Sequence, residues 1–358
     1  MQKLLIISIF ALTIGSALGA YLESDGAQRS SEPQVPPRIL PPPPQGAPAL
    51  KSLIRRLEVR RAYHESGLTV FPICVRRSHG SNIRTMHEAI RRGDLHIREK
   101  GAGEVARILV WNEGRRPVFI MAGEIILGGR QNRIVRHDVL IPGRSRTIEI
   151  DVYCGEQDRW QEGKRSFKSS KSLTAPSLRR MAAGAASQDS IWREIDTQLE
   201  RAEVRSPTRN YEALYRDRQV QRHLDRCVKY FDRVLPAETV GAAVFHGRRV
   251  LGIEIFSDPD LFEALWPKIC RSYAAEVLHP APEPFRRHRR PWPGNPATAS
   301  VERMLHQVLS AGASRENTPG GGSYWRLSHA VSGSSLEYRG DLVHATIFPD
   351  VVWIHPTR

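Results

Sequence analysis

Cysteine is scarce in this sequence, with four residues in a chain of 358. Cys74, Cys154, Cys227 and Cys270 lie far apart, and none of them belongs to a Cys-x-x-Cys pair. This spacing excludes a zinc site made from neighbouring ligands, because such sites place their ligands in closely spaced pairs. In an oxidising compartment the four residues could form up to two disulfides, and Cys227 with Cys270 is one pairing open to them.

Several standard catalytic motifs are also missing. The sequence has no P-loop, no Gly-x-Ser-x-Gly elbow and no two histidines at the spacing of helical metal ligands. A glycine pattern at 101–106 matches a dinucleotide-binding loop on paper, but the strand-like residues 105–111 stand where a helix is required. We therefore expect no metal and no cofactor, and no motif assigns a catalytic residue.

Acidic residues are few compared with basic ones. The sequence has 38 Asp and Glu against 53 Lys and Arg, for a net charge of +15 and a pI near 10.1. This balance favours an anionic partner, either a small molecule or a polyanion of the cell envelope. The basic residues are spread along the chain, without a recognition helix or interleaved aromatic residues, so we expect no binding of nucleic acid. The basic, serine-rich residues 164–171 are typical of a mobile loop.

An apolar run that approaches membrane-spanning length occurs only at the N-terminus. Residues 1–19 combine one lysine, an apolar stretch from Leu4 to Leu12 and a small residue at Gly19, which is the layout of a secretory signal peptide. Cleavage after Gly19 would leave a protein without a membrane span, exported to the periplasm or secreted. The alternative is an N-terminal membrane anchor, since Leu4 to Leu22 is nearly as long as a spanning helix.

Proline-rich stretches divide the rest of the chain. Residues 20–50 are rich in Pro, Ser and Gln, and residues 279–297 combine Pro with the basic run 286–290. Such compositions cannot bury enough apolar surface to offset the entropy lost on ordering. We expect these linkers to flank an α+β domain at 51–278, followed by a small C-terminal α+β extension at 298–358. The extension is either an appendage or an edge extension of the main sheet.

Short apolar runs joined by turns predict the fold class. Residues 148–154 alternate in polarity as in a half-buried strand, and residues 239–245 and 250–256 have the pattern of a hairpin. Helical spacing of apolar residues occurs at 190–204 and 210–231, and again after Asp258. Strands and helices do not alternate regularly. We therefore expect an α+β fold with a predominantly antiparallel sheet, sandwich- or barrel-like, and helices packed on one side.

The stretch 117–160 combines concentrated apolar runs with polar residues that lack helical spacing, so the core and the site are expected to share strands. A glycine pair allows the backbone to approach a ligand closely. Nearby arginines can hold a phosphate or carboxylate through two parallel hydrogen bonds, and the neighbouring amides can donate and accept. The candidate ligand-binding residues are Glu124, Gly128, Gly129, Arg130, Gln131, Asn132, Arg133, Glu156, Arg159 and Trp160.

Several blocks of this sequence resemble a known family. The blocks are AGEIILGGRQNR, DVLIP and CGEQDRW in the same stretch, and GAAVFHGRRVLGIEIF and LFEALWPKICRSYA further on. Together they are similar to the ARG and rhodanese-phosphatase-superfamily-associated protein domain, over residues 57–278. The family name implies an association with genes of the ADP-ribosylglycohydrolase and phosphatase types. The resemblance thus points to a phosphorylated or ADP-ribose-like ligand and supplies no catalytic residue.

Two classes of function fit the candidate residues. In the first, the protein is a ligand-binding or scaffold module, with Glu124, Gln131, Arg133 and Glu156 in a polar network around the glycine turn. In the second, it is a hydrolase whose Glu124 and Glu156 act as acid and base on a glycosidic or phosphate ester bond. A purely structural alternative is an internal salt bridge, for instance between Arg133 and Glu156. Carboxylates that converge in an open cleft would favour catalysis, and closed ion pairs would favour structure.

Overall fold

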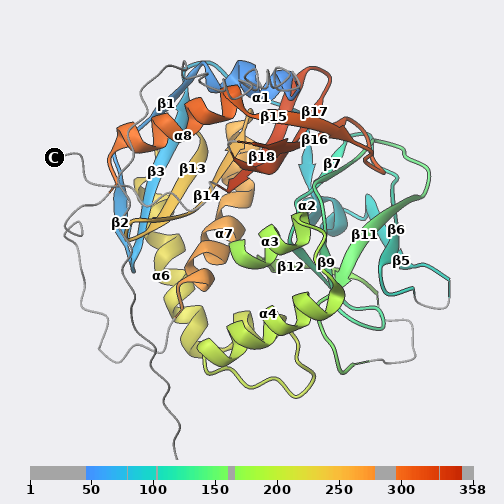
Figure 1. Ribbon diagram of the computed structural model, residues 1–358. Helices are drawn as coiled ribbons and strands as arrows, with labels where there is room; N and C mark the ends of the chain where they lie inside the picture. Colours follow the sequence, from blue (N-terminus) through green and yellow to red (C-terminus); the bar gives the residue numbers. More distant parts are fainter. Residues whose placement is uncertain are drawn as a thin grey trace, which may run out of the picture. The chain divides into compact units, whose positions relative to one another are not determined.

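The computed structural model describes residues 46–78, 80–101, 104–159, 166–278, 296–329 and 331–348, all of which belong to the unit Pro43–Arg358. Helices and strands follow one another along these residues without regular alternation (Figure 1). The helices are α1 (Pro48–Ile54), α2 (Met86–Arg91), α3 (Pro176–Ala183), α4 (Gln188–Arg201), α5 (Glu212–Arg216), α6 (Arg218–Val234), α7 (Pro259–Glu276) and α8 (Thr298–Ser310). The strands form three mostly antiparallel sheets, which confirms the predicted α+β class.

The largest sheet has nine strands, in the order β1-β3-β13-β14-β18-β17-β16-β15, with β2 also paired to β3. These strands are β1 (Leu57–Val59), β2 (Tyr63–Glu65), β3 (Leu68–Val75), β13 (Thr239–His246), β14 (Arg249–Phe256), β15 (Gly312–Glu316), β16 (Ser323–Ser328), β17 (Ser332–Tyr338) and β18 (Asp341–Phe348). In the middle of the sheet β14 pairs with β18, and Ile253 lies opposite Ile347. The described residues after 297 therefore extend the main sheet, which is one of the two arrangements that the sequence left open.

Two smaller sheets share one apolar core. One has the order β10-β7-β4, in which β4 and β7 are parallel, and the other has the order β12-β8-β9-β11-β6-β5. Their strands are β4 (Arg84–Thr85), β5 (Leu95–Glu99), β6 (Arg107–Asn112), β7 (Val118–Ile120), β8 (Glu124–Leu127), β9 (Arg133–Val135), β10 (Val139–Ile141), β11 (Ile148–Cys154) and β12 (Lys168–Leu173). Branched side chains such as Ile108, Val135 and Ile150 fill the core, together with α2. A capping box formed by Thr85 and Glu88 starts α2.

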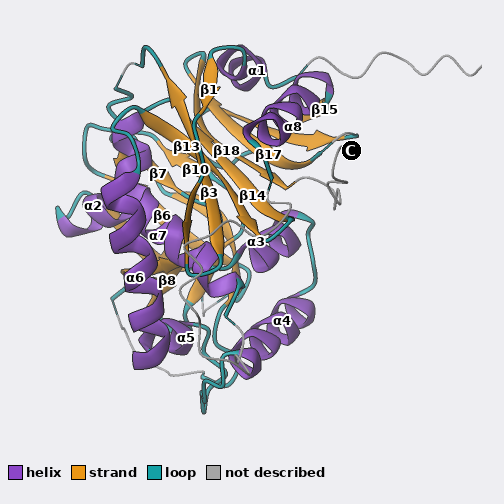
Figure 2. Cartoon of the chain, turned by 90° about the vertical axis from the view of Figure 1, so that its left-hand side faces the viewer, coloured by secondary structure: helices purple, strands orange, loops and turns teal. Residues whose placement is uncertain are grey.

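Helices lie on both faces of the nine-stranded sheet (Figure 2). α1 and α8 pack with Phe71 and Ile253 on one face, whereas α6 and α7 pack with Val70 and Val244 on the other. This differs from the expected arrangement, in which the helices packed on one side only. The reason lies in strands such as β3, whose eight residues are all buried. Because successive side chains of a strand point to opposite faces, a strand that is buried along its whole length needs cover on both faces.

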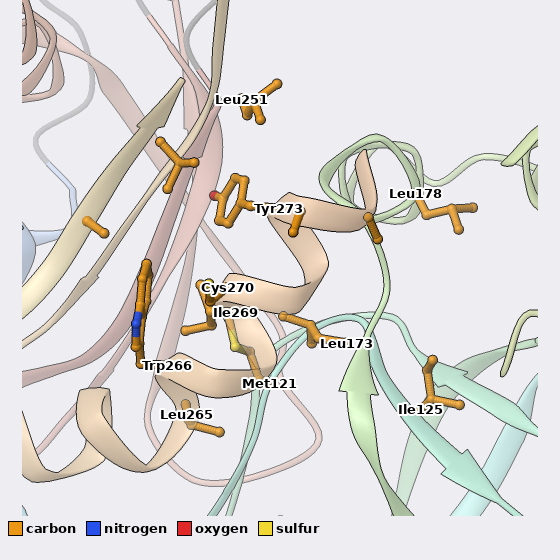
Figure 3. Close-up of a cluster of buried hydrophobic side chains, with 14 of the residues drawn as sticks. Met121, Ile125, Leu173, Leu178, Leu251, Leu265, Trp266, Ile269, Cys270 and Tyr273 are labelled. Atoms are coloured by element: carbon orange, nitrogen blue, oxygen red, sulfur yellow. The ribbon is translucent and has the colours of Figure 1, made fainter. Parts of the chain in front are cut away.

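α7 is the central helix of the larger core. As the sequence predicted, it begins with Pro259, and the side chain of Asp258 accepts a hydrogen bond from the Asp260 N–H. Figure 3 shows Trp266 on one side of this helix and Leu173 on the other, so α7 packs against elements on both sides. Such a helix is apolar over most of its circumference.

All four cysteines are buried and free. Cys227 and Cys270 lie in the same core, but the disulfide that the sequence left open between them is not formed. Burial raises the pKa of the Cys227 thiol to about 11. A thiol with a raised pKa is a poor nucleophile at neutral pH, so Cys227 has a packing role.

Two segments have a structure that differs from the one their local sequence predicts. The helix expected at 210–231 is divided at Asp217, which is extended and caps α6 by accepting hydrogen bonds from the N–H groups of Gln219 and Val220. Part of the loop expected at 164–171 is strand β12, which pairs with β8. Serines alternate toward the interior along β12, so a basic composition did not prevent pairing.

Candidate functional site

Eight of the ten candidate residues, all except Glu124 and Trp160, lie around the turn that joins β8 to β9. Gly128 and Gly129 have φ angles of 114° and 57°, which residues with side chains rarely adopt. A Cβ atom at Gly128 would lie 2.5 Å from the carbonyl oxygen of Ser166. One at Gly129 would collide with the ring of Phe167 and the carboxylate of Glu99. The turn therefore requires glycine at both positions.

Glu99, at the end of β5, holds this turn from one side. Its Oε1 accepts a hydrogen bond from the Arg130 N–H at 2.9 Å, and its Oε2 accepts one from Arg133 Nη2 at 3.2 Å. Arg133 is fully buried and also donates to Gln131 Oε1 at 3.1 Å. The Nε–H of Arg133 has no acceptor among the described residues. Sequence reasoning missed Glu99, because no motif or glycine marks it.

Arg159 holds the turn from the other side. It donates to Glu156 Oε2 at 2.7 Å, to the Gly129 carbonyl at 3.3 Å and to Asn132 Oδ1 at 3.2 Å. Glu156 is only 3% exposed, so its charge needs this partner. The salt bridge considered between Arg133 and Glu156 is not formed, since each pairs with a different residue.

The segment before α5 completes the network. The Thr208 hydroxyl donates to Glu156 Oε1 at 2.7 Å, and Asn132 Nδ2 donates to Asn210 Oδ1 at 3.1 Å. Asn210 also forms an isolated β-bridge with Glu156. We use the name turn network for the residues joined in this way: Glu99, Gly128, Gly129, Arg130, Gln131, Asn132, Arg133, Glu156, Arg159, Thr208 and Asn210.

Glu124 has a separate set of contacts. It is fully buried at the start of β8, where it forms an ion pair with Lys268 of α7 and accepts a hydrogen bond from the Met121 N–H at 3.1 Å. Lys268 also donates to Ser169 Oγ at 3.2 Å. Glu124 and Glu156 thus occupy two closed ion pairs with different partners, and no hydrogen bond in the described residues joins them. The remaining candidate, Trp160, lies outside the described residues.

A second polar cluster joins α3, β14 and β18 inside the core. Glu254 Oε1 lies 2.6 Å from Arg179 Nη1, and Glu254 Oε2 lies 3.0 Å from His344 Nε2 and accepts from the Thr346 hydroxyl at 2.6 Å. His344 Nδ1 in turn lies 2.7 Å from Asp138 Oδ2. We call these five residues the buried charge cluster. Sequence reasoning missed it, although a lone glutamate within the apolar run 250–256 signals a buried ion pair.

The charges in this cluster shift one another's pKa values. Burial alone would lower the pKa of His344, but Asp138 and Glu254 together raise it to about 9. Burial alone would raise the pKa of Glu254, but Arg179 and His344 hold it at about 2. Both groups are therefore charged at neutral pH. Two cations and two carboxylates compensate one another in the core.

The fold and the site define a class of protein: an α+β domain in which arginine–carboxylate pairs join the ends of strands from separate parts of the chain. The chain belongs to the ARG and Rhodanese-Phosphatase-superfamily-associated Protein domain family, which matches it over residues 56–348. The match confirms the resemblance seen in the sequence and continues beyond residue 278 through β18. Searches of curated proteins and of solved structures found no match. In the part of the chain that the structure describes, no helix has the length and apolar character needed to cross a membrane.

Proposed function

We propose that this protein is a binding module for a small anionic ligand with a phosphate or carboxylate group, held at the turn network. The observation that carries the proposal is the Nε–H of Arg133, which is fully buried and meets no acceptor among the described residues. Leaving such a donor unpaired costs about 1–3 kcal/mol. An anionic ligand oxygen at this position would remove that cost.

A second unpaired atom, in a residue that contacts the turn network, is an acceptor. Gln157 Oε1 is buried and has no donor within the described residues, while the backbone carbonyl of Gln157 accepts a hydrogen bond from the Gln131 side chain at 3.4 Å. A ligand that carries a hydroxyl group beside its anionic group would satisfy both Arg133 and Gln157. Sugar phosphates and ADP-ribose-like compounds have this combination.

The charges of the turn network also support an anion. Three arginines (Arg130, Arg133 and Arg159) and two glutamates (Glu99 and Glu156) leave one net positive charge, since three minus two is one. The hydrogen bonds of Arg159 to Glu156, Gly129 and Asn132 hold its guanidinium in place before a ligand arrives. Preorganised donors bind more tightly, because less side-chain entropy is lost on binding.

No contact favours the hydrolase alternative, because the carboxylates of Glu124 and Glu156 already serve as partners of Lys268 and Arg159. An acid or base must be able to reach the substrate. The binding module is therefore the function that the geometry supports best.

Export is part of the proposal. Residues 1–19 lie outside the described residues, and the expectation of a cleaved signal peptide rests on their composition. A mature chain that begins at Ala20, detected by intact mass spectrometry, would support it. In that location the anionic partner is a small molecule or a polyanion of the cell envelope.

The test of the binding site is the Arg133→Lys variant. Lysine keeps the charge but has neither the Nε–H nor the planar fork of arginine. We expect the variant to bind phosphate or ADP-ribose more weakly by about 1–3 kcal/mol, the scale of a lost charged hydrogen bond. Isothermal titration calorimetry with each probe gives the affinity, and thermal unfolding shows whether the variant is folded.

The matched control is Arg84→Lys, since Arg84 forms an ion pair with Asp94 in another sheet and has a partly buried side chain. Both variants are expected to lose some stability, but only Arg133→Lys should lose affinity. Equal affinity of Arg133→Lys and the wild-type protein would remove Arg133 from the site. Failure of the wild-type protein to bind either probe at millimolar concentration would contradict the proposal itself.

A further inference from the structure

Helix α6 carries a row of basic residues on its outer side. The helix packs beside α7 on one face of the nine-stranded sheet (Figure 2), and its side chains at Val220, Leu224, Cys227 and Phe231 are buried in the core. Five exposed cations, which we call the α6 stripe, follow the opposite side: Arg218, Arg222, Arg226, Lys229 and Arg233. None of them belongs to the turn network or to the buried charge cluster.

The α6 stripe is narrow and straight. Its residues recur at spacings of three or four along the helix, so at about 3.6 residues per turn they share an arc of about 80°. At a rise of about 1.5 Å per residue, the stripe is about 22 Å long from Arg218 to Arg233. The centre of the arc lies nearly opposite the buried residues, so the stripe faces solvent.

This arrangement of charge is unfavourable for the helix itself. Like charges at i and i+4 destabilise a helix, and the stripe has three such pairs: Arg218 with Arg222, Arg222 with Arg226, and Lys229 with Arg233. Arg218 is also the first residue of α6, whose first turn has no acidic residue, although the N-terminus of a helix is its positive end. Folding therefore gives no reason for this row of cations.

The side chains of the α6 stripe are available to a ligand. Among the described residues they have no ion-pair partner, and Arg233 lies 6.0 Å from the ring of Tyr230. A different pattern occurs on α4, where Arg193 follows Asp189 by four residues, the favourable order of opposite charges. An anion bound along the α6 stripe would relieve the repulsion that its neighbours on the helix do not.

The flank of the stripe indicates the shape of the ligand. Asp225 and Asp232 lie along one side of the arc, and Asp225 is paired with Arg271. These carboxylates restrict an anion to the narrow arc, which suits a thread better than a flat anionic membrane. A helix that binds a membrane surface also needs an exposed apolar face, whereas the apolar face of α6 is buried in the core.

The residue types of the stripe indicate its chemistry. Four of the five cations are arginines, whose planar fork can hold a phosphate through two parallel hydrogen bonds. No aromatic residue lies within the arc, whereas proteins that bind single-stranded nucleic acids stack the bases on aromatic side chains. Both observations favour a chain of phosphate groups without bases.

We propose that the α6 stripe binds a flexible linear chain of phosphate groups. Successive phosphates would follow the five cations along the helix, and the ions released from the chain would drive binding at low salt. The net charge of +15 would attract such a chain to the protein surface. The site is separate from the turn network, which would hold a single anionic group.

The experiment measures the binding of fluorescently labelled inorganic polyphosphate to the purified protein by fluorescence anisotropy, at several salt concentrations. Phosphate contacts with a single-stranded chain each contribute about −0.7 to the slope of log K against log salt, so five contacts predict a slope of about −3.5. The double variant Arg222→Gln, Arg226→Gln should bind at least about tenfold more weakly at low salt, with a slope reduced by about 1.4.

The matched control is the double variant Arg193→Gln, Arg201→Gln, which removes two exposed arginines from α4 and the same net charge. It should bind polyphosphate as the wild-type protein does. The Tm of the α6 variant should equal or exceed that of the wild-type protein, because like charges have been removed from one helix face. The α6 variant should also keep its affinity for phosphate or ADP-ribose, so this proposal and the one for the turn network fail independently.

Three results would overturn the proposal. The first is a wild-type protein that does not bind polyphosphate at low salt. The second is an equal loss of affinity in the two double variants, which would show that net charge alone controls binding. The third is tighter binding of single-stranded DNA or of anionic lipid vesicles than of polyphosphate at the same phosphate concentration.

Discussion

Glu254 illustrates what a single buried charge requires of its surroundings. It lies in the middle of an apolar strand, and its two oxygens meet Arg179, His344, Thr346 and the hydroxyl of Tyr273 at 2.6 to 3.0 Å. These partners come from three other elements, α3, α7 and β18. Removing one partner of a buried ion destabilises a fold by about 3–5 kcal/mol, because the remaining charge is left uncompensated. The stability contributed by each residue of the cluster therefore depends on the others.

The pKa values of this cluster predict how stability depends on pH. The pKa of His344 rises from 6.5 in the unfolded chain to about 9 in the folded one, so its contribution is complete below pH 6.5 and is lost as the pH rises through about 9. The pKa of Glu254 falls from 4.5 to about 2, so its contribution is complete above pH 4.5 and is lost as the pH falls toward 2. We expect the Tm to fall by several degrees between pH 6.5 and 9.

The same pH series in two histidine variants isolates the cause. His344→Gln should be less stable than the wild-type protein and should lose the slope between pH 6.5 and 9, because no group at this position titrates. His306→Gln replaces an exposed histidine on α8 and should keep the slope. Differential scanning fluorimetry in a set of buffers measures all three proteins. A wild-type Tm that stays flat over this window would contradict the assignment of charge to His344.

At the scale of elements, the turn between β7 and β8 joins the smaller sheets to α3. Gly123, in this turn, donates its N–H to the Val135 carbonyl at 2.8 Å and accepts from the Thr174 N–H at 2.9 Å. Its φ of 86° is unfavourable for other residues. A Cβ atom there would lie 2.5 Å from Thr174 Oγ1 and 2.6 Å from Arg179 Cγ. A side chain at position 123 would therefore strain the backbone and press against Arg179 of the buried charge cluster.

Gly123→Ala should accordingly be one of the more damaging single-methyl additions in the protein. We expect it to destabilise the fold by about 2–5 kcal/mol, the sum of the strain at positive φ and the overpacking against Thr174 and Arg179. Gly247→Ala is the control, because Gly247 also has a positive φ, of 56°, but no atom lies within 4 Å of its added Cβ. That variant should cost only about 1–2 kcal/mol. Chemical denaturation measures the free energy of unfolding of both variants. Equal losses of this free energy would show that the predicted clash at position 123 is relieved without cost.

At the scale of the whole molecule, the residues after 297 bind to several parts of the chain that precede them. β18 pairs with β14, and the Gly321 N–H donates to the Leu140 carbonyl of β10 at 2.7 Å. Glu337 of β17 accepts a hydrogen bond from the Leu50 N–H of α1 at 3.0 Å. The described residues after 297 therefore contact the nine-stranded sheet, the three-stranded sheet and α1. Their removal would expose the β14 edge and two apolar cores.

Limited trypsin digestion tests this integration. The composition of residues 286–290, a basic run in a proline-rich linker, predicts that trypsin cleaves there first. These residues lie outside the described ones, so this expectation rests on the sequence alone. We expect the two fragments to stay together in native gel filtration, because strand pairing and core packing join them, and to separate in denaturant. Separation under native conditions, or resistance of the run to trypsin, would contradict this view.

The sequence by itself determined the features that depend on neighbours along the chain. The alternation at 148–154, the hairpin of β13 and β14 and the start of α7 after Asp258 were all predicted, because side-chain periodicity and capping act over a few residues. The same local chemistry located the glycine turn and left an internal salt bridge open as the role of Glu156. It also explains the errors at β12 and at Asp217, where composition and periodicity alone do not define the pairing or the break.

Only the tertiary structure decided which charged residues pair. Arg133 pairs with Glu99, 34 residues away, and Glu124 pairs with Lys268, 144 residues away. Glutamate and arginine have the same chemistry wherever they lie in the chain, so their order in the sequence does not say which will meet. Strand order brings them together, and strand order depends on how whole sheets bury their apolar faces. For this reason the sequence indicated a polar site at the turn, whereas its closed ion pairs and the unpaired Arg133 donor emerged only from the fold.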